Sequence, residues 1–278
     1  MTKTVQPPAE HDDAHVSVEV RDRVGVVWLD RPDKRNAYTP TMARQLASAL
    51  RDLDADDQVR VIVVTGRGSD FCVGADLDID WRAPEVHGVE TVTDPDHLPW
   101  KLATPIIAAL NGACIGVALT WALQFDIRVV GDDVRLAVPF NRIGVIPDRN
   151  SLWLLSRLIG HSRAMDLLLT GRTFGADEAV SMGLATRAVP AADTLATALQ
   201  IADDIATKCS PASTTATKVL AYEFLETNDR MRAYHMERRV LNWVRTLGET
   251  ARGVVAFRER RAPEWGSSKH DRPPWELR

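Results

Sequence analysis

VRVIVVTGRGSDFCVGADL (59–77) is the stretch that carries most of the evidence for the fold. Its first part is a nearly continuous apolar run ended by glycine, which is typical of a strand buried on both faces. The stretch ALNGACIGVALTWAL (109–123) has the same order of strand and glycine-containing turn, and then continues as an apolar helix. We expect each turn to lead to a helix N-terminus with free backbone N–H groups, and two such ends can hold an oxyanion between them. Two ordinary strand–helix turns are the alternative.

The rest of the chain continues this alternation. Apolar runs at 15–20 and 24–29 predict a hairpin, and Thr39-Pro40 predicts the start of an amphipathic helix with proline at its first position. Further strands are expected at 105–110, 127–130, 135–138 and 185–190. Helices are expected at 116–125, 151–160, 162–169, 176–182, 191–207, 212–225, 230–246 and 249–261. Strands alternating with helices, followed by helices alone, predict an α/β core with a C-terminal helical region.

The domain boundaries follow from the same patterns. Residues 1–15 are polar and acidic and are expected to be a disordered tail. We expect the core to span 16–200 and the helical region to span 201–278. The stretch 78–100 contains several prolines and acids without clean periodicity, so we expect a lid or a binding loop there.

Composition excludes several classes of protein. The 278 residues include 34 Lys and Arg against 38 Asp and Glu, and residues 228–278 carry 12 basic against 7 acidic side chains. No single-sign block is long enough for an extended phosphate footprint, which argues against nucleic-acid binding. No apolar run has the length of a membrane span. The three cysteines are widely spaced without a CxxC pattern, so we expect a reducing, cytoplasmic setting, no disulfide framework and no metal site.

Five stretches, taken in order, resemble the crotonase superfamily, which is the enoyl-CoA hydratase/isomerase family. They are LDRPDKRNAYTPTM (29–42), VIVVTGRGSDFCVGADL (61–77), TPIIAALNGACIG (104–116), FNRIGVIPDRNSLWLLSRLIG (140–160) and RAMDLLLTGRTFGADEAVSMGLATRAVP (163–190). The resemblance implies a crotonase-like spiral of ββα units, with C-terminal helices that assemble a homotrimer or a dimer of trimers. It also implies an acyl-CoA thioester substrate, with coenzyme A as part of that substrate and no separate cofactor.

The resemblance implies an oxyanion hole made by the backbone N–H groups of Ala75 and Val117. Family members often have glycine at the second of these positions. A β-branched Val117 either narrows the acyl channel or indicates that the backbone there avoids positive φ. The neighbouring residues Gly116, Asp76 and Leu77 are implied to line the bound thioester.

The segment DRPDKRNA (30–37) resembles the family's site for the CoA adenine and phosphates. Lys34 and Arg35 are the implied phosphate partners, and Ala37 is an implied backbone contact. The alternative is that Lys34 and Arg35 form an ordinary charged turn.

The acid–base residues depart from the hydratase pattern. By resemblance, Thr120 and Phe140 occupy the positions of the two glutamates that typical hydratases use. Phenylalanine transfers no proton and threonine is too weak an acid, which argues against two-glutamate hydration. Asp148 instead matches an aspartate of isomerase members similar to the phenylacetate-pathway isomerase. One base suits double-bond migration, because it removes a proton from one carbon and returns it to another while the amides hold the dienolate.

Several alternatives stay open for Asp148. It could cap the helix that begins near Asn150, or act as a nucleophile as in a dehalogenase-type branch of the family. Arg149 stands where relatives usually have glycine. If Arg149 pairs with Asp148, the pKa of the carboxylate falls and Asp148 becomes a poor proton shuttle; if Arg149 points to solvent, Asp148 is unaffected.

The remaining alternatives concern the reaction itself. Hydratase chemistry with groups from the lid is one, and a non-catalytic acyl-CoA-binding protein is another. Trp121, Thr120 and Phe140 are expected to line the acyl pocket. Four of the eight tryptophans are near this pocket in sequence, which fits a bulky acyl group and fits core packing equally well.

Overall fold

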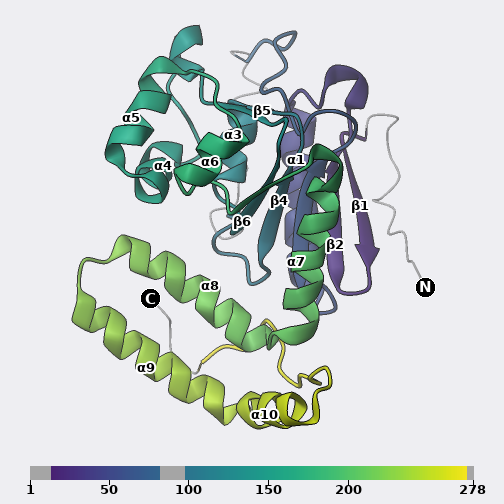
Figure 1. Cartoon of the computed structure of the whole chain (residues 1–278), viewed down its shortest axis with the longest axis vertical. Coiled ribbons are helices and arrows are strands. Elements are labelled where there is room, and N and C mark those ends of the chain that lie inside the picture. The colour runs from purple at the N-terminus through teal and green to yellow at the C-terminus, as the bar shows by residue number, and fades with distance from the viewer. Residues whose placement is uncertain (1–13, 82–97, 274–278) are drawn as a thin grey trace.

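The computed structural model describes residues 14–81 and 98–273, so nearly all of the expected tail and most of the expected lid lie outside the described residues. Its main sheet has six strands in the order β1-β2-β3-β4-β6-β8 (Figure 1). β1 and β2 form the predicted antiparallel hairpin, and every other neighbouring pair is parallel. The strands are β1 (Val16–Arg21), β2 (Val24–Leu29), β3 (Val61–Gly66), β4 (Ile106–Leu110), β6 (Ile127–Gly131) and β8 (Arg187–Val189).

Helices cover both faces of this sheet. Because side chains alternate along a strand, Ile62 and Val64 of β3 point to one face while Val61 and Val63 point to the other. The first face packs in one core with α1 (Pro40–Ala55), and the second packs against α7 (Thr194–Lys208). The fully buried α7 side chains in this contact are alanines, which let the helix approach closely.

The start of α1 shows why the sequence-based prediction was correct there. The Thr39 side chain accepts a hydrogen bond from the Met42 backbone N–H at 3.0 Å, and Pro40 follows at the first helical position. The cap satisfies a backbone donor that the first turn leaves unpaired. The predicted helix is therefore confirmed at the residue where it was expected to begin.

A small second sheet pairs β5 (Ala113–Ile115) with β7 (Arg135–Ala137) in parallel. β5 was missed in the sequence, because three residues directly after a turn are too few to show a period. The shorter helices α3 to α6 gather beside these two strands (Figure 1). They are α3 (Val117–Ala122), α4 (Ser151–Ile159), α5 (His161–Thr170) and α6 (Ala176–Ser181). The 3-10 turns within the described ranges are η1 (Pro32–Lys34), η3 (Phe140–Ile143) and η4 (Ala191–Asp193).

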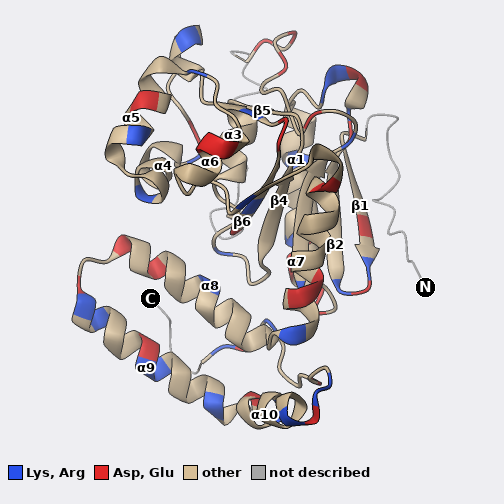
Figure 2. Cartoon of the chain, in the orientation of Figure 1, with Lys and Arg blue, Asp and Glu red and all other residues tan. Residues whose placement is uncertain are grey.

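The helices α8 (Pro211–Glu226), α9 (Arg230–Thr246) and α10 (Glu249–Glu259) form an arm below the sheet (Figure 1). They have a small apolar cluster of their own, to which Val240 and Trp243 belong. α7 crosses the expected boundary at residue 200 and remains packed on the sheet through Ala206, so the junction lies after α7 rather than within it. The arginine excess of the C-terminal part is concentrated along α9 (Figure 2).

The last described residues return from this arm to the core. The Lys269 ammonium is buried and donates to the carbonyl oxygens of Leu53 and Val59 and to the Thr104 hydroxyl. This contact fixes the C-terminal segment against the start of β3. No helix in the described ranges has the length and apolar character needed to cross a bilayer.

Candidate active site

Two loops from different parts of the chain lie side by side at one edge of the small sheet. Cys72 and Cys114 form a parallel bridge, in which the Cys72 N–H donates to Ala113 at 2.9 Å and the Cys72 carbonyl accepts from Ile115 at 3.1 Å. In a parallel register, equal steps along both segments keep residues opposite one another. Ala75 and Val117 are each three residues beyond this bridge, so the two predicted donor amides belong to segments that start side by side.

The Ala75 amide faces away from its own bridge. Tyr38 pairs with this segment through both of its backbone groups, donating to Gly74 at 2.8 Å and accepting from Asp76 at 2.9 Å. This leaves the Ala75 N–H on the opposite side, where it donates to no group among the described residues. The expectation of a helix N-terminus was wrong here: Ala75 lies in an extended segment that Tyr38 holds in place.

Val117 is the first residue of α3, so its N–H is one of the donors that a helix leaves unpaired. The preceding Gly116 has φ +59° and ψ −123°, a conformation that other residues rarely adopt. A Cβ built on Gly116 would meet no atom within 4 Å, so open space lies in front of it. The backbone at Val117 avoids positive φ, because the preceding Gly116 takes the positive φ instead. This was the second of the two explanations for a valine at this position.

Asp148 is linked to the same helix. The Thr120 hydroxyl lies 2.7 Å from Asp148 Oδ1 and 3.2 Å from the Val117 carbonyl oxygen, so the shorter contact is to the carboxylate. Residues three apart share one face of a helix, which places Thr120 on the side of Val117. One turn of α3 therefore connects the carboxylate to Val117, the predicted oxyanion donor.

The Asp148 carboxylate does not cap α4. The cap position is Asn150, in a left-handed conformation and without a side-chain hydrogen bond. The Asp148 backbone carbonyl accepts from the Ser151 N–H and hydroxyl, while its carboxyl group turns to Thr120. Oδ2 accepts no hydrogen bond from the described residues, which leaves it available to a ligand.

Arg149 does not pair with its neighbour Asp148 within the described part of the chain. Its guanidinium carbon lies 4.6 Å from the centre of the Trp121 ring, and one of its nitrogens donates to the Tyr38 hydroxyl at 3.1 Å. Neither of the arrangements considered for Arg149 is therefore the one observed. The Asp148 carboxylate therefore has no ion pair with Arg149 among the described residues.

Tyr38 connects these groups. Its hydroxyl accepts a second hydrogen bond from the Trp121 indole N–H at 2.9 Å, and its ring stacks on Trp81 with centroids 6.5 Å apart. Burial raises the pKa of the Tyr38 phenol, so it is neutral at physiological pH. Trp121 is buried in the main core and contacts Tyr38 and Arg149, and its place in the acyl pocket stays a prediction.

The expected CoA-binding residues have different surroundings. Lys34 is exposed and lies 3.6 Å from Asp78, so its ammonium is accessible to a phosphate. The Ala37 carbonyl accepts a hydrogen bond from Arg31 at 2.7 Å, and Asp76 pairs with the same arginine at 3.0 Å. The Leu77 side chain is 84% exposed. The structure brings Ala37 and Asp76 together through Arg31, which the sequence did not single out.

Arg35 is engaged within the protein. Its guanidinium donates to both oxygens of Asp70, at 2.9 Å and 3.1 Å, in a bidentate pair. Asp70 is buried and also accepts from the Ala113 N–H at 2.8 Å. Buried Asn36 joins the same two loops, donating to the carbonyl oxygens of Arg67 and Asp70. This network holds the loop that leads to Ala75.

The Asp70 network predicts a specific loss of stability in acid. The hydrogen bond from Arg35, more than any other cause, lowers the pKa of Asp70 from its usual 3.8 to about 2. A depressed pKa stabilises the fold fully above about pH 4, and this contribution disappears as the pH falls towards 2. We expect the ionised Asp70 carboxylate to contribute about 1–2 kcal/mol to the free energy of unfolding. This is less than the full pKa shift implies, because the Arg35 side chain is half exposed.

Urea unfolding of wild type and Asp70→Asn measures this contribution. The difference in unfolding free energy should be largest near neutral pH and should shrink towards about pH 3. A difference that stays constant with pH would show that the carboxylate charge has no part in it.

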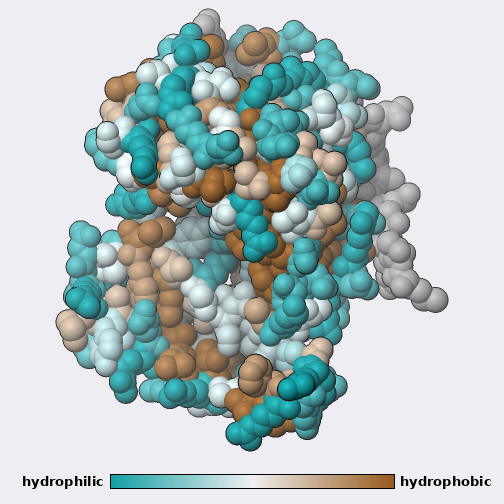
Figure 3. Space-filling model, viewed as in Figure 1, coloured by the Kyte–Doolittle hydropathy of each residue, from teal (hydrophilic) through white to brown (hydrophobic). Residues whose placement is uncertain are grey.

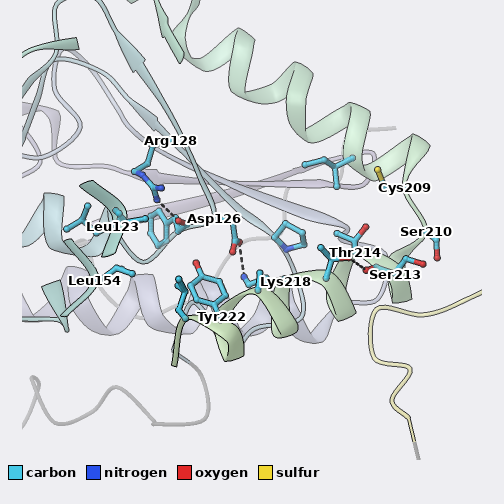
Figure 4. A pocket seen from close by; sticks show the side chains of 17 residues that line it. Leu123, Asp126, Arg128, Leu154, Cys209, Ser210, Ser213, Thr214, Lys218 and Tyr222 are labelled. Atoms are coloured by element: carbon cyan, nitrogen blue, oxygen red, sulfur yellow. Dashed lines mark hydrogen bonds and ion pairs between the residues drawn. The ribbon is translucent and has the colours of Figure 1, made fainter. Parts of the chain in front are cut away.

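A separate cavity of about 670 Å³ lies between α8 and the core (Figure 4). Its walls include Leu123, Leu154 and Leu225, and brown, apolar atoms line the hollow beside α8 in Figure 3. Its polar floor is a buried pair in which the Lys218 ammonium lies 2.8 Å from Asp126. None of the predicted site residues lines this cavity, and Phe140 packs against the main core.

Comparison with known proteins identifies the fold and the family. The crystal structure of enoyl-CoA hydratase from Mycobacterium tuberculosis H37Rv superposes with a TM-score of 0.82 at 29% identity, covering 91% of this chain and 99% of that one. The architecture is therefore the crotonase fold. The family model described as enoyl-CoA hydratase/isomerase matches residues 19–268, and the chain belongs to that family.

Two relatives show the range of reactions in their names. Enoyl-CoA hydratase ACTT3 of Alternaria alternata is 34% identical over 260 residues, covering 90% of this chain and 85% of that protein. The 1,2-epoxyphenylacetyl-CoA isomerase of Escherichia coli strain K12 is 32% identical over 256 residues, covering 88% and 96%. The chain thus belongs to a family of acyl-CoA enzymes, and its relatives include proteins named as hydratases and one named as an isomerase.

Proposed function

We propose that this protein is an enoyl-CoA isomerase in which Asp148 is the single base. The observation that carries the proposal is the Asp148 carboxylate, which accepts a hydrogen bond from Thr120 through one oxygen, while its other oxygen accepts none from the described part of the chain. Its partner Thr120 lies one helical turn from Val117, whose amide we propose as an oxyanion donor together with the Ala75 amide.

The proposed reaction moves a double bond without adding any atom. Asp148 Oδ2 removes a proton from C2 of a 3-enoyl-CoA, and the electron pair moves into the thioester to form a dienolate. The Ala75 and Val117 N–H groups stabilise the developing oxyanion. Asp148 then returns the proton to C4, which gives the 2-enoyl-CoA and regenerates the carboxylate. This chemistry needs no cofactor beyond the coenzyme A of the substrate itself.

A panel of thioesters tests the proposal. Wild-type protein is incubated with 3-enoyl-CoA and 2-enoyl-CoA substrates. The products are separated by chromatography and their molecular masses are measured by mass spectrometry. Conversion between the two without a gain of mass supports isomerisation. Turnover that adds one water, with no isomerisation, would establish a hydratase in its place, and binding of thioesters without any turnover would establish a binding protein.

Hydratase activity is the second candidate, favoured by the names of relatives such as ACTT3. It would require a water activated by Asp148 alone, since Thr120 and Phe140 occupy the two expected glutamate positions. Covalent chemistry by Asp148 is distinguished by the mass of the protein, which would rise by the mass of an attached group during turnover.

We further propose a cytoplasmic homotrimer, or dimer of trimers, assembled through the C-terminal helices. The Phe257 side chain on α10 is 86% exposed. On α9, Met231 is 57% exposed and Leu241 is 50% exposed. Exposed apolar side chains on an arm that stands away from the core are typical of a surface buried by another subunit.

Phe257→Glu is expected to weaken this assembly, because it places a charge on a surface that the trimer would bury. Light scattering coupled to gel filtration should give about three or six times the 30.8 kDa chain mass for wild type and smaller species for the variant. Leu169→Glu, at an exposed residue of α5, is the matched control and should leave the mass unchanged. A monomeric wild type at all concentrations would contradict the proposal.

A further inference from the structure

The Tyr38 hydroxyl has an unusual set of partners. Indole and guanidinium N–H groups only donate hydrogen bonds, and Trp121 and Arg149 both donate to the Tyr38 oxygen. With both acceptor sites occupied, the Tyr38 O–H must point in a third direction. The residue is only 4% exposed, and its O–H has no acceptor among the described residues.

Arg149 also keeps donors without partners. Among the described residues its guanidinium makes one hydrogen bond, to Tyr38, although it has five N–H groups. Its Nε is buried and has no hydrogen-bond partner, while its flat face lies over the Trp121 ring. A buried donor left unpaired is costly, and such groups usually meet a partner in the functional state.

These donors belong to segments that also carry predicted site residues. Tyr38 is bridged to Ala75, the first oxyanion donor. Arg149 directly follows the predicted base Asp148, and its side chain reaches back to Tyr38. The two unpaired donors therefore form one cluster beside the segment that carries the predicted base.

We propose that Tyr38 and Arg149 together select acyl groups that carry a hydrogen-bond-accepting oxygen beyond the reacting carbons. The Tyr38 O–H and the Arg149 Nε–H would both donate to that oxygen. A carboxylate would gain most, since a guanidinium binds it through charge-assisted hydrogen bonds, and a neutral carbonyl would gain less. The inference rests on the proposed function in one respect, namely that the ligand is a CoA thioester.

Binding of saturated thioesters tests this selectivity without requiring catalysis. Calorimetry would compare hexanoyl-CoA with adipoyl-CoA and 5-oxohexanoyl-CoA, and then the corresponding pairs two carbons shorter and longer. For the chain length that fits, we expect the oxygen-bearing thioester to bind at least roughly tenfold more tightly than the apolar one. The carboxylate and ketone arms show whether the charge or the oxygen alone is recognised.

Two variants assign the effect to its residues. Tyr38→Phe removes only the hydroxyl and should reduce the preference several-fold. Arg149→Gly removes the guanidinium and suits the left-handed backbone at φ +51°, so the fold should be retained and the carboxylate preference lost. Arg157→Gln is the matched control, because Arg157 also lies over a tryptophan, Trp153, but outside the cluster. Thermal unfolding of each variant verifies the fold.

The outcomes separate the inference from the proposed function. Equal binding of apolar and oxygen-bearing thioesters by wild type would overturn the inference and leave an acyl-CoA enzyme in place. A preference that survives in both variants would overturn it as well, since other residues would then read the oxygen. Absence of binding by any thioester, or by coenzyme A, would overturn the proposed function together with the inference.

Discussion

Asp148→Asn is expected to lower kcat for double-bond migration about a thousandfold, within the range that a positioned general base contributes. Asparagine has nearly the same shape, and its side-chain oxygen can still accept the hydrogen bond from Thr120. It cannot take up the C2 proton. The affinity for a saturated acyl-CoA should change little, because the carboxylate acts on the reacting carbons rather than on coenzyme A. Steady-state kinetics and calorimetry on the same preparations measure both quantities.

Thr120→Val is the companion variant for this prediction. It keeps the carboxylate and removes the 2.7 Å hydrogen bond that orients it, so we expect a smaller loss, of roughly tenfold. Full isomerase activity in Asp148→Asn would show that another group is the base. Equal losses in the two variants would indicate that the orientation of Asp148, and not its basicity, limits the reaction.

Val117→Pro is expected to reduce kcat by about a hundred- to a thousandfold, the usual effect of removing one oxyanion donor. Proline has no N–H, yet it suits the first position of a helix, where that N–H is not used by the helix itself. The Gly116 conformation is the mirror image of the extended region that a residue before proline prefers, and glycine adopts both hands equally. The substitution therefore removes the donor with little disturbance of the backbone.

Val117→Ala provides the control for the missing donor. It shortens the side chain and keeps the N–H, so its kcat should remain within a fewfold of wild type, apart from effects of the altered channel width. A similar loss in the alanine and proline variants would assign the effect to the side chain. An active proline variant would contradict an oxyanion role for the Val117 amide.

The sequence alone was sufficient to predict the features that depend on neighbouring residues and on the order of motifs along the chain. The hairpin, the capped start of α1 and the family were predicted because strand periodicity, Thr39-Pro40 and the five motifs are all visible in one dimension. The resemblance assigned Thr120 and Asp148 to one site, and the structure adds the hydrogen bond that joins them.

The missed features depend on where side chains turn in three dimensions. Arg149 could be placed beside Asp148 in sequence, but only the structure shows it turned to Tyr38 and Trp121. Arg35 has the composition of a phosphate ligand, and its pairing with Asp70, 35 residues away, cannot be read from a charged turn. Tyr38 gave one usable signal, a lone tyrosine in the motif that also contains Lys34 and Ala37.

The central claim is that one carboxylate, Asp148, takes a proton from C2 and returns it to C4. The most direct test converts a 3-enoyl-CoA deuterated at C2 in ordinary water and locates the label in the 2-enoyl-CoA product by NMR. We predict deuterium at C4 with wild type, and loss of both turnover and transfer with Asp148→Asn. A wild-type product with no label at C4, or the same labelled product formed at an undiminished rate by Asp148→Asn, would contradict the claim.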